Sequence, residues 1–438
     1  MAVGPAPDEY PIRLVVRDDD LGRSRLTVLF RLVLAIPMLV WLVLRGIAAF
    51  VVGFVNWIAV LVQGEVPDSL HDFVASYVRY ATQVSAYVYL AADPYPWFRV
   101  QADYPVDVEI DQPARQGRWG GFFRLLLALP ALVLATALGG GLSFGSSGSS
   151  SSSTQGGSET LWAAGASAGG AAAVAAFLAW FYILVRGRTS RGARDLVAYA
   201  LGYGAQALGY VLLVTGRYPS SDPAHAAPHA ELPPHPVRME VTDDLARSRL
   251  TVLFRLLLAI PHIVWITLWS IAVLFVSIAD WLDALATGSV PATLHRFLSA
   301  YVRYAVHLQA YLYVVGRRFP GFTGRPGSYG IDLEIDPPHR QSRWSIFFRL
   351  FLSLPAMLLA GALGGVLLVL AFLGWWHALA RGFMPEGLRN LGAACIRYQE
   401  QTSAYLLLLT DRYPYAAPVL QGKPEPQEVA APALGDAF

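Results

Sequence analysis

The sequence RSRLTVLFRLVLAIP at residues 23–37 returns almost unchanged as RSRLTVLFRLLLAIP at residues 247–261. Weaker copies read RWGGFFRLLLALP at 118–130 and RWSIFFRLFLSLP at 343–355. Self-similarity of this kind indicates tandem copies of one structural unit. We therefore divide the chain into four repeats, which are A (12–100), B (104–219), A′ (237–322) and B′ (329–415).

The remaining segments flank or connect the repeats. They are an N-terminal tail (1–11), a Gly/Ser-rich insertion inside repeat B (139–157), a Pro/Ala/His linker (220–236) and a C-terminal tail (416–438). Because the C-terminal tail is rich in Pro and Ala and follows the last repeat, we expect it to be disordered.

The composition favours a membrane protein. Of 438 residues, 55% are hydrophobic and 15% are charged, and the mean hydropathy is +0.43. Soluble domains contain about 25% charged residues, so a soluble globule and a disordered chain are both disfavoured. The net charge of +2 is not that of a nucleic-acid-binding protein. The single cysteine, Cys395, excludes an intrachain disulfide.

Each repeat has the same order of segments. Short alternating stretches, which begin at Arg13, Val106, Val237 and Ile331, predict β-strands. A long apolar block follows, and residues 26–62 would form one helix of roughly 55 Å, against about 30 Å of hydrocarbon. We therefore expect each block to form a hairpin, with tips at Arg45–Gly46 in repeat A and near residues 361–365 in repeat B′.

The last segment of each repeat is rich in tyrosine. In repeat A, the positions Phe73, Tyr77, Tyr80, Val84 and Tyr87 form one helical stripe. Such a helix is typical of a membrane interface, although the sequence leaves open whether it lies on the membrane or spans it.

The predicted fold is an all-α membrane protein with four repeated helical hairpins, about eight transmembrane helices, cytoplasmic amphipathic helices and short β-strands. The strands are expected to pair into one sheet, and a pseudo-two-fold axis is expected to relate the two halves. Short hairpin helices require local thinning, tilt adjustment or shallow insertion. The placement of arginine predicts that the strands and both termini of this multipass protein lie in the cytoplasm.

The motifs FRLVLAIP and YVRY, followed by AY and a Tyr-Pro turn, are similar to those of domain-of-unknown-function family 4389. This family consists mainly of actinobacterial membrane proteins, and the resemblance extends over most of residues 12–415 as tandem copies. It implies a multipass bacterial membrane protein and implies no reaction, ligand or catalytic residue. Repeat B departs from the pattern, because Gly202 replaces the arginine of the other repeats.

Two sets of arginines are candidate sites for anions or lipid headgroups. The motif arginines inside the apolar blocks either snorkel to lipid phosphate or form a shared anion site. The arginines of the Tyr-rich segments either anchor the chain to anionic lipid or form a partner-docking surface. The first set is Arg31, Arg124, Arg255 and Arg349, and the second is Arg79, Arg303 and Arg397.

Asn56 and Asp280 occupy equivalent positions in repeats A and A′ and form a candidate intramembrane polar site. A carboxylate there is a candidate for coupling ion or proton movement. Asp283, in the same apolar segment but near its cytoplasmic end, either shares that role or simply faces water or an arginine. No catalytic motif, metal site or cofactor site is recognised in the sequence.

The function predicted from these features is a non-enzymatic membrane scaffold or partner-docking protein of unknown biochemical activity. Its expected partners are the lipid bilayer, anionic headgroups and another membrane protein. The alternative is a transporter or channel for a small solute or lipid, which the parallel repeats and Asp280 favour.

Overall fold

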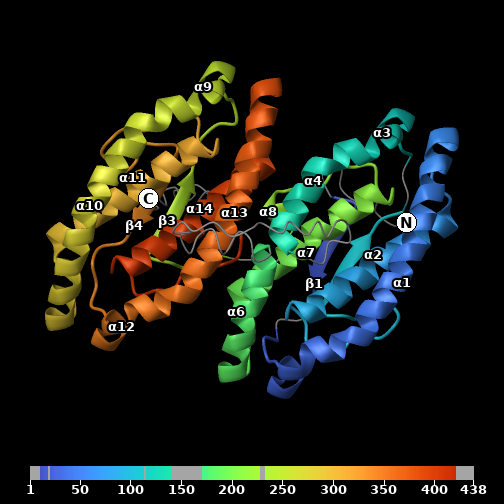
Figure 1. The fold of residues 1–438 in the computed structure, drawn as a ribbon, viewed down its shortest axis with the longest axis horizontal. Coiled ribbons are helices and arrows are strands. Elements are labelled where there is room, and N and C mark those ends of the chain that lie inside the picture. Colours follow the sequence, from blue (N-terminus) through green and yellow to red (C-terminus); the bar gives the residue numbers. More distant parts are fainter. Residues whose placement is uncertain (1–9, 18–19, 113–114, 141–169, 227–231, 421–438) are drawn as a thin grey trace, which may run out of the picture.

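The computed structural model describes residues 10–17, 20–112, 115–140, 170–226 and 232–420. Repeats A and B form one half of the molecule, and repeats A′ and B′ form the other. Figure 1 shows the two halves side by side, with α1 and α10 at opposite outer edges of the molecule and running in opposite directions. The expected pseudo-two-fold relation between the halves is therefore present.

The four predicted strands form where the alternating sequence placed them. They are β1 (Ile12–Val16), β2 (Val106–Ile110), β3 (Val237–Val241) and β4 (Ile331–Ile335). The single sheet that we expected is wrong, because the described strands form two separate antiparallel sheets, β1 with β2 and β3 with β4. The two repeats of each half therefore pair their strands with each other, and the hydrogen bonds of each sheet stay within one half.

Three long helices contradict the predicted hairpins. They are α1 (Arg25–Gln63), α10 (Arg255–Thr287) and α13 (Arg349–Arg381), and each is continuous. Arg45, the expected tip, lies inside α1 and donates a hydrogen bond to Ser76 at 2.8 Å. Its guanidinium also lies 5.0 Å from the centre of the Tyr80 ring. Because Arg45 has these partners within the fold, the chain does not need a loop in water at this position. Without these hairpins, the expected count of about eight membrane helices has no basis, and three described helices are long and apolar enough to cross a membrane.

Repeat B differs from the others. Its apolar block forms α3 (Arg118–Phe122), α4 (Arg124–Gly139) and α6 (Ala171–Arg186). Residues 141–169, which include most of the predicted Gly/Ser insertion, lie outside the described residues. The short helices α9 (Arg249–Leu253) and α12 (Arg343–Phe347) precede α10 and α13 in the second half.

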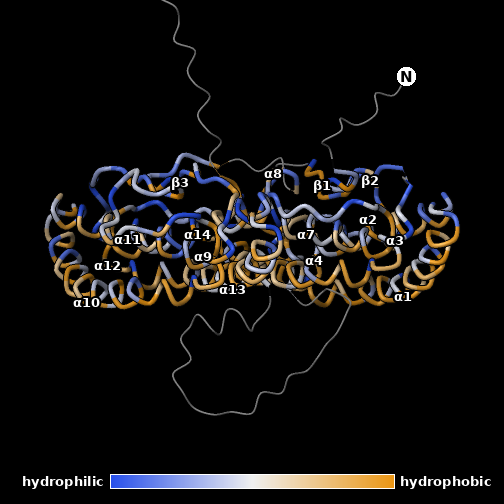
Figure 2. Tube along the Cα trace, turned by 90° about the horizontal axis from the view of Figure 1, so that it is seen from above, coloured by the Kyte–Doolittle hydropathy of each residue, from blue (hydrophilic) through white to orange (hydrophobic). Residues whose placement is uncertain are grey.

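The elements form three layers, which Figure 2 shows edge-on. The strands lie on one face and the long apolar helices on the other. The Tyr-rich helices lie between them, and their order along the chain is α2 (Asp68–Val88), α7 (Arg191–Val211), α11 (Ala292–Leu312) and α14 (Glu386–Leu406). Each sheet covers its Tyr-rich helices on one side, because β2 contacts α2, β1 contacts α7, β4 contacts α11 and β3 contacts α14.

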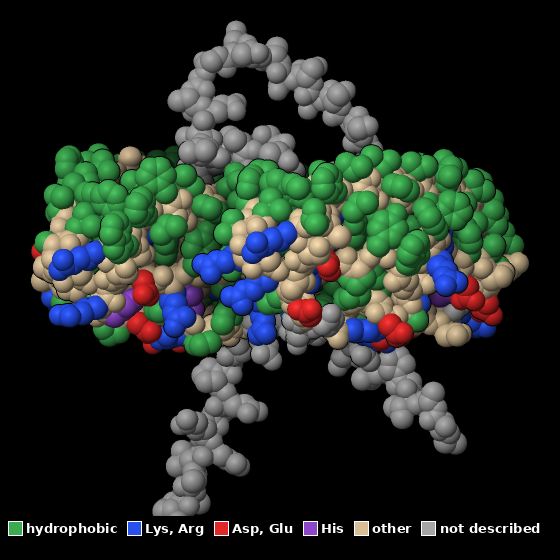
Figure 3. Space-filling view, turned by 90° about the horizontal axis from the view of Figure 1, so that it is seen from below, with side chains coloured by type: hydrophobic (Ala, Val, Ile, Leu, Met, Phe, Trp, Pro, Cys, Tyr) green, Lys and Arg blue, Asp and Glu red, His purple; other side chains and the backbone are tan. Residues whose placement is uncertain are grey.

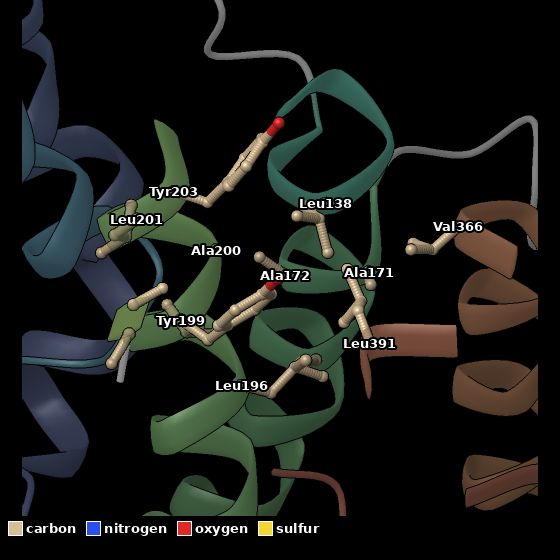
Figure 4. Close-up of a cluster of buried hydrophobic side chains, with 14 of the residues drawn as sticks. Leu138, Ala171, Ala172, Leu196, Tyr199, Ala200, Leu201, Tyr203, Val366 and Leu391 are labelled. Carbon is tan, nitrogen blue, oxygen red and sulfur yellow. The ribbon is translucent and has the colours of Figure 1, made fainter. Parts of the chain in front are cut away.

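The two halves meet where α13 packs against α4 and α6. Small side chains on α6, Ala171 and Ala172, lie beside Leu138 of α4, and Val366 of α13 lies opposite (Figure 4). Linker residues join this interface, since the short helix α8 (Pro223–Ala226) contacts α7 and α14.

The first residues of the predicted disordered tail belong to the fold. Ala417 is fully buried, and Arg397 of α14 donates hydrogen bonds to the carbonyl oxygens of Ala417 and Val419. The expectation of disorder from residue 416 is therefore wrong for 416–420, because these residues satisfy a buried guanidinium. Residues 421–438 lie outside the described residues.

Candidate functional site

The four motif arginines are buried and share two kinds of contact in every repeat. A third contact differs between repeats, and it is to Asp93 for Arg31, Gln116 for Arg124 and Gln341 for Arg349. Each guanidinium lies 4.2–4.5 Å from the centre of a tyrosine ring near the end of the Tyr-rich helix. Each also donates to two carbonyl oxygens there. The pairs of acceptors are Tyr87 and Ala92 for Arg31, Tyr210 and Thr215 for Arg124, Tyr311 and Gly316 for Arg255, and Tyr405 and Thr410 for Arg349.

The carbonyls in each pair flank one strained residue. Leu90, Leu213, Val314 and Leu408 have φ values of 59–64°, which side chains other than glycine rarely adopt. A cation also stabilises the carbonyl end of a helix. The motif arginines therefore hold the turn that ends each Tyr-rich helix. Protein atoms occupy this position in place of the predicted lipid phosphate or shared anion.

The arginines of the Tyr-rich helices have three different environments. Arg79 pairs with the buried Asp107 of β2 at 2.5 Å, and Arg397 binds the carbonyls of residues 415–419. Arg303 donates to the carbonyl oxygens of Leu333 and Gly324. Its Nε atom also lies 3.6 Å from the Asp332 carboxylate. Arg303 lines a cavity of about 550 Å³, and the described residues that line this cavity include Arg296 and Arg325 but no acidic residue. Of this set, Arg303 lies in the surroundings that best suit an anion.

Asn56 and Asp280 are both completely buried, on α1 and α10. Neither side chain has a hydrogen-bond partner among the described residues. The large cavity described below is lined by neither of them. The structure therefore confirms a buried polar position in both halves, and a role in coupling stays a prediction.

One face of the molecule is apolar. Large hydrophobic side chains on the long helices are exposed there, including Leu32, Phe50, Leu256 and Phe351, each more than 70% exposed. Figure 3 shows this surface as an almost uninterrupted band of hydrophobic side chains, with charged side chains gathered toward the opposite face. Contiguous apolar patches larger than a few hundred Å² mark membrane or protein interfaces.

A cavity of about 990 Å³ lies in the second half, behind this face. Val273 of α10 and Met357, Gly361 and Gly364 of α13 form its walls. Its floor consists of residues from α11 and α14, with Gln309 and Glu400 among them. Gln309 donates to the Glu400 carboxyl at 2.6 Å. Burial raises the pKa of Glu400 to about 8, so this carboxyl is mostly protonated at neutral pH.

The family model for the Domain of unknown function (DUF4389) matches the chain four times, at residues 25–99, 160–221, 249–323 and 343–417. These copies cover more than half of the sequence. The chain belongs to the DUF4389 family. No curated protein and no solved structure matches it, so the geometry of this DUF4389 chain is the basis for any functional inference.

The sequence analysis missed Gln309 and Glu400. A comparison of equivalent positions could have revealed Glu400, because it aligns with the uncharged residues Thr82, Ala205 and Val306 in the other DUF4389 copies. An acidic residue at a position that is uncharged in the other three copies indicates that the surroundings of this position differ in repeat B′.

Proposed function

We propose that this DUF4389 protein is a non-enzymatic membrane scaffold that lies within one leaflet, with its apolar face in the hydrocarbon and its strand layer in water. The observation that carries the proposal is the collection of exposed hydrophobic side chains on a single face of the slab (Figures 2 and 3). This arrangement replaces the multipass one that we predicted from sequence.

The packing of the layers favours helices that lie in the membrane plane. As a 39-residue helix, α1 is about 58 Å long. If α1 stood upright, the attached helix α2 and the Arg79–Asp107 pair would enter the hydrocarbon with it. Burying such charges costs several kcal/mol. An in-plane position inserts only the apolar side chains.

Residues at the ends of the long helices suit the headgroup region. Trp119 and Trp344 are exposed at the start of the apolar blocks of repeats B and B′, and tryptophan is enriched at membrane interfaces. At the equivalent starts of repeats A and A′, Arg25 and Arg249 donate to carbonyls at the ends of α6 and α13. We propose that the headgroups lie at this level. The positive-inside rule then places the strand layer and both termini in the cytoplasm of a bacterial cell.

The transport alternative depends on a polar path through the molecule. The one observation in favour of transport is the buried side chain of Asp280, which has no hydrogen-bond partner among the described residues. The scaffold proposal accounts for the whole apolar face, and we therefore prefer it. The polar face, with Arg303 and its basic cavity, is where we propose that a partner or anion binds.

The proposal is tested by attaching spin labels to two cysteine variants of the full chain in liposomes. Phe50→Cys places a label on the apolar face, and Glu109→Cys places one on the strand layer. Relaxation by oxygen should dominate at residue 50, and relaxation by a water-soluble nickel complex should dominate at residue 109. A water-exposed label at residue 50 would refute the proposal. Unmodified protein is the labelling control, because burial raises the pKa of Cys395 to about 12 and keeps its thiol unreactive.

A further inference from the structure

We propose that the cavity between α10 and α13 binds one uncharged amphiphile from the bilayer, which has an apolar chain and a hydroxyl-bearing head. This inference rests on the proposed membrane position, because the ligand would enter from the leaflet. The cavity volume of about 990 Å³ lies at the upper end of the range for small-molecule sites.

The entrance to the cavity is on the apolar face. The walls belong to α10 and α13, whose outer side chains form that face. The floor belongs to α11 and α14, whose other side is covered by β4 and β3. Leu368, at the edge of the cavity on α13, is 58% exposed. The cavity is therefore continuous with the surface that we place in hydrocarbon.

The charges of the lining select the class of ligand. The described residues of the cavity lining include no lysine, arginine or histidine, and Glu400 is the only carboxylic acid among them. A phosphate or carboxylate head would have no cation to pair with, and burial of an unpaired charge is costly. An anionic phospholipid is therefore disfavoured, and an uncharged head is favoured.

The floor offers both a donor and an acceptor. The Gln309 side-chain oxygen is buried and has no hydrogen-bond partner among the described residues. Glu400 is 3% exposed, and its carboxyl is mostly protonated at neutral pH because burial raises its pKa. A hydroxyl can donate to the Gln309 oxygen and accept from the Glu400 carboxyl. Such a group would satisfy a buried atom whose isolation costs about 1–3 kcal/mol.

The first half of the same chain provides an internal comparison. The equivalent cavity there is about 160 Å³ in volume. Its lining has Ser85 and Ala205 where the second half has Gln309 and Glu400. The large cavity and the polar pair therefore occur together and, among the described residues, only in the second half. A binding site would show this combination, whereas a feature that follows from the repeat itself would be present in both halves.

The test uses the full chain in liposomes with a monoacylglycerol probe that carries a diazirine on its acyl chain. After illumination, we expect crosslinks to residues 399–407 that excess 1-oleoylglycerol competes away. Gly364→Leu places a side chain in the cavity, where its Cβ meets the flexible Gln399 amide and no other described atom. Glu400→Leu removes the carboxyl from the polar floor. Each variant should reduce the competed crosslinking at least tenfold.

The matched control is Gly139→Leu, the same substitution at the equivalent glycine of the first half, where a Cβ meets no atom of the described residues within 4 Å. It should leave crosslinking unchanged. Equal crosslinking in Gly364→Leu and wild type would overturn the proposal, as would stronger competition by oleate or oleylamine than by 1-oleoylglycerol. Liposome flotation of the same variants separates the two claims. Gly364→Leu should still float, whereas failure of wild type to float would refute the membrane position instead.

Discussion

The guanidinium of Arg349 lies 4.2 Å from the centre of the Tyr405 ring and donates to the carbonyl oxygen of that same tyrosine at 3.0 Å. Arg349 also receives support from Gln341, whose side-chain oxygen accepts a hydrogen bond at 2.5 Å. One buried cation thus fixes the end of α14 and the strained turn at Leu408.

We expect Arg349→Met to lower the free energy of unfolding by about 3 kcal/mol or more, because it leaves buried carbonyls without a donor. Denaturant titration followed by circular dichroism measures this change. Arg99→Met, at an exposed arginine, is the control and should have an effect within about 0.5 kcal/mol. If Arg349→Met were as stable as wild type and lost only its affinity for anionic lipid, the structural role would be wrong.

Reciprocal tryptophan contacts join the two repeats of the first half. Trp57 of α1 donates to the carbonyl oxygen of Gly121 at 3.0 Å, and Trp180 of α6 donates to that of Val28 at 3.1 Å. We expect Trp57→Phe to lower the free energy of unfolding by about 1 kcal/mol through loss of this hydrogen bond. Trp119→Phe, at a 79% exposed position, should have little effect. Equal losses of unfolding free energy in both variants would show that the Trp57–Gly121 hydrogen bond does not contribute to stability.

Glu400 should make stability depend on pH in a defined direction. Burial raises its pKa from 4.5 to about 8 in the folded protein, so the folded state binds the proton more tightly than the unfolded state. Its contribution is fully present below about pH 4.5 and is lost as the pH rises toward 8. The difference in unfolding free energy between wild type and Glu400→Gln should therefore change across this window and be flat outside it. A difference that is constant from pH 4.5 to 8 would contradict the assignment.

The buried carboxylate of Asp280 should lower the free energy of unfolding when no ligand or ion is bound to it. Its carboxylate is fully buried without a hydrogen-bond partner among the described residues, and repeat A has Asn56 in its place. We expect Asp280→Asn to raise the free energy of unfolding by about 1 kcal/mol or more, since it removes a group that is expensive to bury in charged form. Thermal unfolding measures this, and a lower melting temperature would instead indicate that Asp280 has a stabilising partner.

The local elements could be predicted from the sequence because their patterns depend on neighbouring residues. The alternating stretch after Arg13 forms β1, and the stripe that includes Tyr80, Val84 and Tyr87 is buried on α2. The pairing of the strands could not be predicted in the same way, because it depends on how each half closes on itself.

The hairpins were predicted wrongly because length and hydropathy do not distinguish a helix that crosses a membrane from one that lies in its plane. A finer pattern was present in α1. Its buried residues, which include Ala35, Met38, Leu42, Ala49 and Gly53, keep one helical phase on both sides of Arg45. A turn at residue 45 would have interrupted that phase.

The roles of the polar residues were harder to predict. The tyrosine rings and carbonyl oxygens that the motif arginines share as partners lie more than fifty residues away in sequence, as for Arg31 and Tyr87. An arginine in an apolar block therefore indicated a site for lipid or anion, although its acceptors are backbone carbonyls of the same chain. The cavity at Glu400 depends on four helices and could be located only from the structure.

The most direct test of the one-leaflet position is the labelling of Ile47→Cys in sealed liposomes with a membrane-impermeant maleimide. Residue 47 adjoins the predicted hairpin tip, but in the structure it lies on α1 and is 60% exposed among the apolar side chains. The account predicts no labelling from either side until detergent is added, whereas Glu109→Cys is labelled from its own side. Labelling of residue 47 from the side opposite to residue 109 would contradict it.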